Sequence, residues 1–411
     1  MIRLPHSNIW KLFVIKGALW FMIIMPIIVL FFQDNGLNLQ QIMTLQAFYS
    51  LSLSLMEIPS GYAADIIGRR KTLILGCIFA FIGFSIFSVS YDFWWFLIAE
   101  ILLGFGNSFI SGADTALMYD SLIEVKAENQ FLKYEGRSIS IGNFSEAAAG
   151  IIGGFLASIS FRYPAYAQVL IALITIPFAI SLVEPKINTE RLKSSWESIK
   201  NVVKFSLVES KILRTYIIYS SAIGLGTLMM AWLAQPFLKE IGINMKSYGI
   251  IWALLNIVVG IVAFFAHKIE TLLSELKSLF IVGIFCVLGY IFIANNMNYV
   301  GLIILFIFYG NRGYATPILR NYINQHTESN IRATVMSIRS FIIRIFFAII
   351  APFIGWIADQ HGLKSAYLIM GLTLCILAIP CLIFLTINFK NEKIYIVNIS
   401  YNNQLLNKGT K

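Results

Sequence analysis

Long apolar segments alternate with short polar ones along most of the 411-residue chain. A helix that crosses a membrane needs about 20 mostly apolar residues, because each residue advances it by about 1.5 Å and the hydrocarbon core is about 30 Å thick. Most connections are short, so successive helices run antiparallel. We therefore expect an all-α polytopic membrane protein with twelve transmembrane helices: residues 10–32, 41–64, 72–91, 94–118, 138–160, 164–183, 213–237, 247–267, 278–296, 299–319, 334–357 and 365–388.

One connection differs from the others in length and polarity. Residues 185–211 are polar and basic, and they begin at Pro185, a natural stop for the preceding helix. With six spans on either side, this linker divides the chain into two six-helix bundles, residues 1–184 and 212–389, followed by a polar, mobile tail over residues 390–411. Four apolar residues of the linker recur at helical spacing and predict an amphipathic helix on the membrane surface: Trp196, Ile199, Val203 and Leu207.

Composition and charge agree with a membrane location. Hydrophobic residues make up 58% of the chain and charged residues 13%, more apolar surface than a soluble protein of this size can bury. The net charge of +10 reflects Lys and Arg on one side of the membrane rather than a nucleic-acid partner. The opposite side has only Arg162, Lys239, Lys246 and Lys364. This asymmetry predicts a bacterial plasma (inner) membrane protein with both termini in the cytoplasm.

A charged loop between the second and third spans matches a known pattern. Gly61, Asp65, Gly68, Arg69 and Arg70 fit G-x-x-x-D-x-x-G-R-R, and the loop faces the cytoplasm in the predicted orientation. It resembles the signature loop of the major facilitator superfamily of secondary transporters, and the span count and central linker fit as well. The resemblance implies two bundles that rock about a central cavity and expose the substrate to each side in turn.

The resemblance also assigns roles within this loop. Asp65 would face the positive N-terminal end of the eleventh span, near Thr334, and latch the outward-open state. Gly61 is expected to permit close helix packing, and Arg69 and Arg70 to hold the loop in the cytoplasm. The residues Gly61, Asp65, Gly68, Arg69 and Arg70, together with Asp120 as an interfacial partner of one arginine, form the predicted conformational latch.

Charged residues inside spans are costly and therefore mark candidate functional positions. Glu57, Asp114 and Glu146 are the candidates for proton coupling, because burial allows a carboxylate to bind and release a proton near neutral pH. A structural ion pair with Lys16 is the alternative for Glu57. Glu100, nearer the outer face, is expected to be hydrated.

Arginines near the midplane dominate the second half of the chain. Arg312 and Arg344 cannot carry protons, but they can clamp a carboxylate or phosphate, or neutralise Glu57 or Glu146 across the cavity. Arg320 and Arg339 lie nearer the cytoplasm and are expected to snorkel to the interface. The further substrate-binding candidates are the polar or aromatic residues Gln235, Asn256, Trp20 and Trp232.

These features favour a secondary transporter of a small organic solute, acting as a monomer with protons and the lipid bilayer as its other partners. No cofactor, metal site or catalytic constellation is expected. Export of a drug-like compound or an anionic metabolite such as a siderophore is the leading hypothesis, because the Gly150–Gly153–Gly154 stretch resembles an antiporter motif. Helix packing is the alternative role of these glycines. Against a drug–proton mechanism, Glu100 stands where such antiporters carry an arginine. Uptake by symport and a non-transporting receptor remain open.

Overall fold

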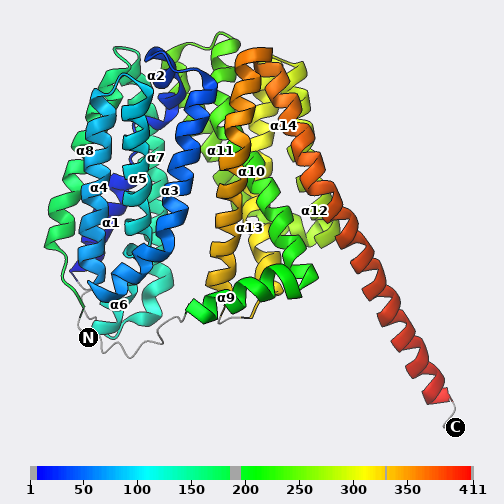
Figure 1. The fold of residues 1–411 in the computed structure, drawn as a ribbon. Helices are drawn as coiled ribbons and strands as arrows, with labels where there is room; N and C mark the ends of the chain where they lie inside the picture. Colours follow the sequence, from blue (N-terminus) through cyan, green and yellow to red (C-terminus); the bar gives the residue numbers. More distant parts are fainter. Residues whose placement is uncertain (1–6, 186–195, 329–330, 409–411) are drawn as a thin grey trace.

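The computed structural model describes residues 7–185, 196–328 and 331–408, and its regular elements are helices. Figure 1 shows two helical halves side by side, with α9 beneath the second half. The N-terminal half comprises α1 (Asn8–Trp20), α2 (Ile28–Asp34), α3 (Leu39–Ile66), α4 (Arg69–Val89), α5 (Phe93–Ser111), α6 (Asp114–Glu124), α7 (Phe131–Ala157) and α8 (Arg162–Ser181). The C-terminal half comprises α10 (Lys211–Glu240), α11 (Met245–Leu273), α12 (Glu275–Asn295), α13 (Tyr299–Gln325) and α14 (Arg332–Lys408).

The predicted twelve-span fold is confirmed. Within the described ranges, 10 helical segments are long and apolar enough to cross a membrane. One of them, Arg332–Phe389, contains the eleventh and twelfth spans, because α14 is broken at Gly362, whose φ of 80° suits glycine. The remaining span is α3, which is 28 residues long but carries several serines and glutamines that lower its hydropathy.

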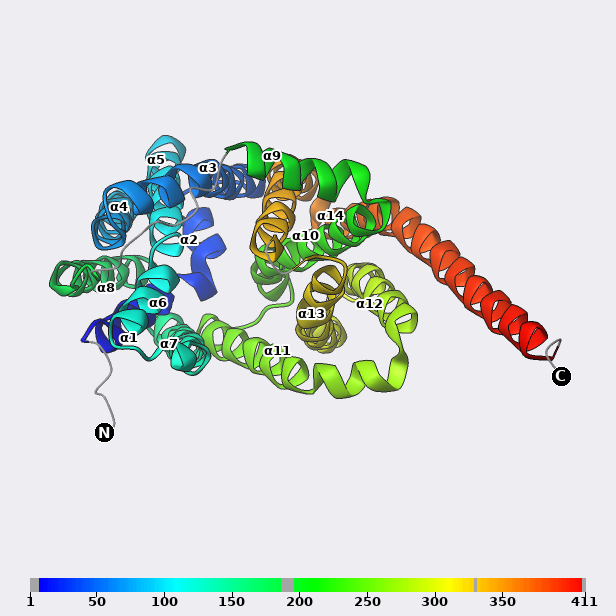
Figure 2. The same cartoon turned by 90° about the horizontal axis from the view of Figure 1, so that it is seen from below.

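The central linker forms α9 (Trp196–Lys204), followed by a π-helical turn over Phe205–Glu209 that leads into α10. Figure 2 shows α9 crossing one end of the C-terminal half. We call this the linker end, since it also carries the α3–α4 loop, and we call the opposite end the far end. Beyond Phe389 the backbone of α14 continues as a helix that projects away from the bundles (Figure 1), where the sequence predicted a mobile tail.

The first span is not the single helix that the sequence predicted. Residues 21–24, between α1 and a 3-10 turn over Met25–Ile27, are not helical, and Pro26 supplies no backbone N–H there. Irregular backbone at membrane depth must find hydrogen bonds within the protein. Gln168 of α8 accepts one from Ile23 N at 2.8 Å. Gln235 of α10 accepts from Val29 N and donates to the carbonyl oxygen of Met25, both at 2.9 Å.

Contacts between the two halves gather towards the far end. Besides Gln235, Asp359 of α14 accepts hydrogen bonds from the first backbone amides of α3, Leu39 N at 2.9 Å and Gln40 N at 2.7 Å. Gly249 of α11 lies against Gly150 and Gly154 of α7, so closely that a methyl group on Gly249 would come within 2.1 Å of the Gly150 carbonyl oxygen. The far end is therefore closed in this conformation.

Candidate functional site

An ion pair joins the two halves near the middle of the molecule. Arg344 Nη1 of α14 lies 3.2 Å from Glu57 Oε2 of α3, and the two side chains keep 27% and 36% of their exposure. This pair corrects the alternative in which Glu57 binds Lys16. Because both side chains are partly hydrated, the pair contributes little to overall stability, at most about 1 kcal/mol. Its importance is that it joins opposite halves.

A second group of polar side chains also spans the two halves. Glu146 of α7 interacts electrostatically with Arg312 of α13, and Trp252 of α11 lies beside the same carboxylate. Arg312 also lies 5.7 Å from the ring centre of Tyr309. Trp252 and Tyr309 are only 7% and 1% exposed, yet Trp252 Nε1 and Tyr309 Oη lack a hydrogen-bond partner of normal geometry among the described residues.

This group has the chemistry of a binding site. Trp252 Nε1 lies beside Glu146 and Tyr309 Oη beside Arg312, but neither makes a hydrogen bond of good geometry among the described residues, so a molecule that accepts hydrogen bonds from them would be stabilised there. Arg312 adds planar, charged donors, and Glu146 adds an acceptor of opposite charge. The described side chains of Glu146 and Arg312 interact without forming a direct ion pair, which leaves both groups able to bind a ligand.

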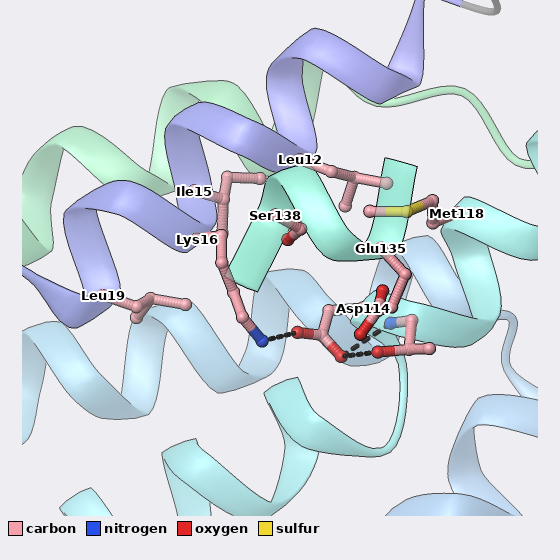
Figure 3. A pocket seen from close by; sticks show the side chains of 9 residues that line it. Leu12, Ile15, Lys16, Leu19, Asp114, Met118, Glu135 and Ser138 are labelled. Carbon is pink, nitrogen blue, oxygen red and sulfur yellow. Dashed lines mark hydrogen bonds and ion pairs between the residues drawn. The ribbon is translucent and has the colours of Figure 1, made fainter. Parts of the chain in front are cut away.

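Asp114 lies within the N-terminal half rather than between the halves. It follows the break between α5 and α6, and its Oδ1 accepts a hydrogen bond from Thr115 N at 2.6 Å. Its Oδ2 binds Lys16 Nζ of α1 at 2.8 Å. Figure 3 shows Glu135 of α7 beside this pair, at a cavity of about 10 Å³, room for one water molecule at most. This site can hold a proton, but not a solute.

The predicted latch loop is tightly bonded on the α4 side. Glu184, the residue before Pro185, accepts hydrogen bonds from the first amides of α4, Arg69 N and Arg70 N, each at 2.8 Å. The positive φ of Gly68, 96°, turns the chain into that helix. Asp120 pairs with the Arg69 guanidinium, as the sequence predicted for one of the two arginines.

On the α3 side, the latch differs from expectation. Asp65 is exposed and makes no hydrogen bond or ion pair with any described residue, so the predicted contact near Thr334 is not formed in this conformation. Gly61 is not a close-packing position here, because a methyl group on it would meet nothing within 4 Å.

Of the remaining substrate-binding candidates, Asn256 contacts the Glu146–Arg312 group through Trp252, and the other three are engaged elsewhere. Gln235 is buried and fully engaged by the broken first span. Trp20 covers Gly142 of α7, within the N-terminal half, and lies 5.8 Å from Lys16 Nζ. Trp232 is buried in the apolar core, and Asn256 donates a hydrogen bond to the carbonyl oxygen of Trp252 at 3.1 Å. Their roles in substrate binding stay predictions.

Two features escaped the sequence analysis. Glu100 of α5 is buried and accepts a hydrogen bond from Gln46 of α3 at 2.8 Å, which corrects the expectation that it is hydrated. The Trp252 indole was not singled out, because one tryptophan in an apolar span usually indicates packing. The sequence did offer one signal for the burial of Glu100. Gln46 is a polar residue inside the second span, and a polar residue there usually has a partner within the protein.

Comparisons with known proteins agree with this architecture. The sequence model of the Major Facilitator Superfamily matches residues 13–345. The quinolone resistance protein NorA of Staphylococcus aureus (strain MSSA476) is 22% identical over 386 residues, which cover 90% of this chain and 92% of NorA. The uncharacterized MFS-type transporter YxaM of Bacillus subtilis (strain 168) is 22% identical over 366 residues, 85% of this chain and 89% of YxaM.

Solved structures share the fold at low sequence identity. The crystal structure of the nucleoside transporter NupG superposes with a TM-score of 0.78 at 12% identity, covering 91% of this chain and 98% of NupG. The similarity extends over both halves and not over one bundle alone. The family model spans most of the chain, and the protein therefore belongs to the Major Facilitator Superfamily and is a multi-pass membrane transporter, not an enzyme.

Proposed function

We propose that this transporter exports a small organic solute in exchange for protons, and that the Glu146–Arg312 group binds the solute. The observation that carries the proposal is the group of polar side chains drawn from both halves: Glu146 of α7 acts on Arg312 of α13, and the buried Trp252 and Tyr309 lie beside these two charges. A solute with an acidic group would bind Arg312, and its basic group would bind Glu146. A proton competes with that basic group for Glu146, which is the condition for exchange.

The proposed direction of transport and class of solute are supported by the relatives of this chain. NorA is a quinolone resistance protein, and this name supports efflux of a drug-like compound. A carboxylate-bearing metabolite such as a siderophore would satisfy Arg312 equally well. The excess of Lys and Arg at the linker end supports a cytoplasmic linker end and cytoplasmic termini. In that orientation the closed far end corresponds to an inward-facing state of a bacterial inner-membrane protein.

Uptake by symport is the second candidate function, and the interaction between Glu146 and Arg312 favours it in one respect. Protonation of Glu146 would remove the negative charge that acts on Arg312, so that a proton and a purely anionic solute would bind together. Under exchange, acidification weakens solute binding at this site. Under symport, acidification strengthens it. Binding of a zwitterionic and a purely anionic solute at two pH values therefore separates the two mechanisms.

Reconstitution into liposomes tests the proposed function. With a quinolone as the first probe, a pH gradient should drive its movement, and Glu57→Gln or Glu146→Gln should abolish the coupled flux. Glu240→Gln, at an exposed far-end position, is the matched control and should leave the flux unchanged. Flux that ignores the gradient would remove proton coupling, and unaltered flux in both variants would remove these two carriers. Counterflow of the probe would exclude a non-transporting receptor.

A further inference from the structure

Another pair of arginines lies in the C-terminal half, nearer the linker end than Arg312. Arg339 of α14 is only 6% exposed, and its Nε donates a hydrogen bond to Ser220 Oγ of α10 at 2.5 Å. Among the described residues no carboxylate forms an ion pair with Arg339, and Arg320 of α13 is close enough to repel it. The sequence predicted that both arginines would snorkel to the interface. For Arg339 this is wrong.

A buried guanidinium without a counter-charge is energetically unfavourable. Removing a charge from water costs several kcal/mol, and a neutral hydroxyl such as Ser220 returns only part of it. The neighbouring positive charge of Arg320 increases the cost further. An anion between the two guanidinium groups would supply the missing counter-charge and offset the repulsion between them. Each guanidinium group can donate two parallel hydrogen bonds to an oxyanion.

The position of Arg320 shows where such an anion would come from. Arg312, Thr316 and Arg320 follow one another at four-residue intervals, so they lie within about 80° of one another around α13. Arg312 acts on Glu146 of the other half, and both Thr316 and Arg320 are exposed. Arg320 therefore lies on the side of α13 that faces the other half, ~12 Å nearer the linker end than Arg312.

We propose that Arg320, Arg339 and Ser220 form an anion-binding site that takes a phosphate- or carboxylate-type group. The site lies on the route from the linker end to Arg312, and this placement rests on the proposed function. It would capture the acidic group of a solute before that group reaches Arg312. Two sources share the required chemistry: a soluble anion in the opening between the halves, and the phosphate of an anionic lipid headgroup.

Thermal unfolding of the purified full-length protein tests the site without any transport assay. The protein is delipidated in neutral detergent and compared in inorganic phosphate and in sodium chloride of equal ionic strength. Phosphate at ten times its Kd should raise the Tm of the wild type by about 1.5 °C. Arg320→Gln and Arg339→Gln should lose this rise. Arg332→Gln is the matched control, because it removes one exposed positive charge from the same helix and should keep the rise.

A second arm replaces phosphate with phosphatidylglycerol, using phosphatidylcholine as its control. A rise with phosphate that depends on Arg320 and Arg339 supports a site for soluble anions. A rise with phosphatidylglycerol alone, with the same dependence, assigns the site to a lipid headgroup and removes it from the solute route. A rise that is equal in all four proteins, or absent in both arms, overturns the proposal. Because Arg320 is exposed, Arg320→Gln should fold even if Arg339→Gln does not.

The two proposals fail in distinguishable ways. Loss of the anion-dependent rise in Tm with intact proton-coupled flux removes only the anion site. Loss of proton coupling with an intact, arginine-dependent rise removes only the proposed exchange mechanism. The anion site then remains as a property of the C-terminal half.

Discussion

At the scale of single residues, two glutamines support the break in the first span from opposite halves. Gln168 belongs to α8 of the N-terminal half, whereas Gln235 belongs to α10 of the C-terminal half. The hydrogen bond to Gln168 can persist throughout a rocking motion, because both partners move together. The two hydrogen bonds to Gln235 exist only while the far end is closed.

Gln235→Leu should therefore shift the conformational equilibrium towards an open far end. It leaves Val29 N–H and the Met25 carbonyl without partners in the closed state, at a cost of roughly 1–3 kcal/mol for each group. Gln168→Leu should instead lower the Tm without changing the conformation. Spin labels at Asp34 and Glu240, exposed far-end positions on opposite halves, report the distance. An unchanged distance distribution in Gln235→Leu would show that Gln235 does not hold the far end closed.

Candidate functional residues could be predicted from the sequence only where a charged or polar residue interrupts an apolar span. Glu57, Glu146, Arg312 and Arg344 are visible because a charge inside a span is rare. Their pairing was left open, because it depends on the relative depth and rotation of helices from different halves. The role of Gln235 could not be predicted, since its partners are backbone atoms of a break that hydropathy does not show.

At the scale of helices, glycines set how closely the two halves approach. Gly150 and Gly154 of α7 meet Gly249 of α11 across the two halves, whereas Gly153 of α7 packs against the carbonyl of Ile23 within the N-terminal half. Backbone-to-backbone approach of this kind needs residues without side chains. These contacts favour the packing role of the Gly-rich stretch over a signature of transport direction, and they place it at a junction that must separate when the far end opens.

Gly249→Ala should prevent close contact between α7 and α11. The added methyl would meet the Gly150 carbonyl oxygen at 2.1 Å, whereas a methyl on Gly260 of the same helix would meet nothing within 4 Å. Gly260→Ala is therefore the control. We expect a longer far-end distance between spin labels and slower transport in Gly249→Ala only. Normal closure in that variant would mean that the helices can slide to accommodate the methyl group.

Helix positions followed well from hydropathy, whereas helix interruptions did not. The ends of α7, α8 and α10 lie within a few residues of the predicted spans, apart from extensions at the linker end such as residues 131–137 of α7. The break at residues 21–24 lies inside an apolar run, so the mean hydropathy does not reveal it, whereas the polar and small residues around Gly112 were included in the predicted fourth span. Neighbouring helices stabilise these breaks, and such tertiary contacts leave no periodic signal in the sequence.

At the scale of the whole molecule, one conformation explains the state of the latch loop. The far end is closed by Gln235, Asp359 and Gly249, and Asp65 at the linker end is exposed and has no partner in the described part of the chain. The family pattern predicts that Asp65 acts when the linker end closes. The sequence could predict two rocking halves, but it could not predict which end is closed here, because one sequence encodes both states.

Asp65→Asn should change the free energy of unfolding by no more than about 0.5 kcal/mol, because in this conformation Asp65 has no partner among the described residues to lose. Transport should nevertheless slow, since the variant weakens the state with a closed linker end. The measurements are thermal unfolding and the initial rate of flux in proteoliposomes, with Asp34→Asn as the exposed control at the other end. Wild-type turnover in Asp65→Asn would remove the latch role.

The broken first span also has a consequence for biosynthesis. The partner of Val29 N lies 206 residues later in the chain, and the partner of the Met25 carbonyl lies 210 residues later. A ribosome that has completed the first half has therefore left two backbone groups of the nascent protein without their final partners. These two hydrogen bonds of the closed far end can form only after α10 has entered the membrane.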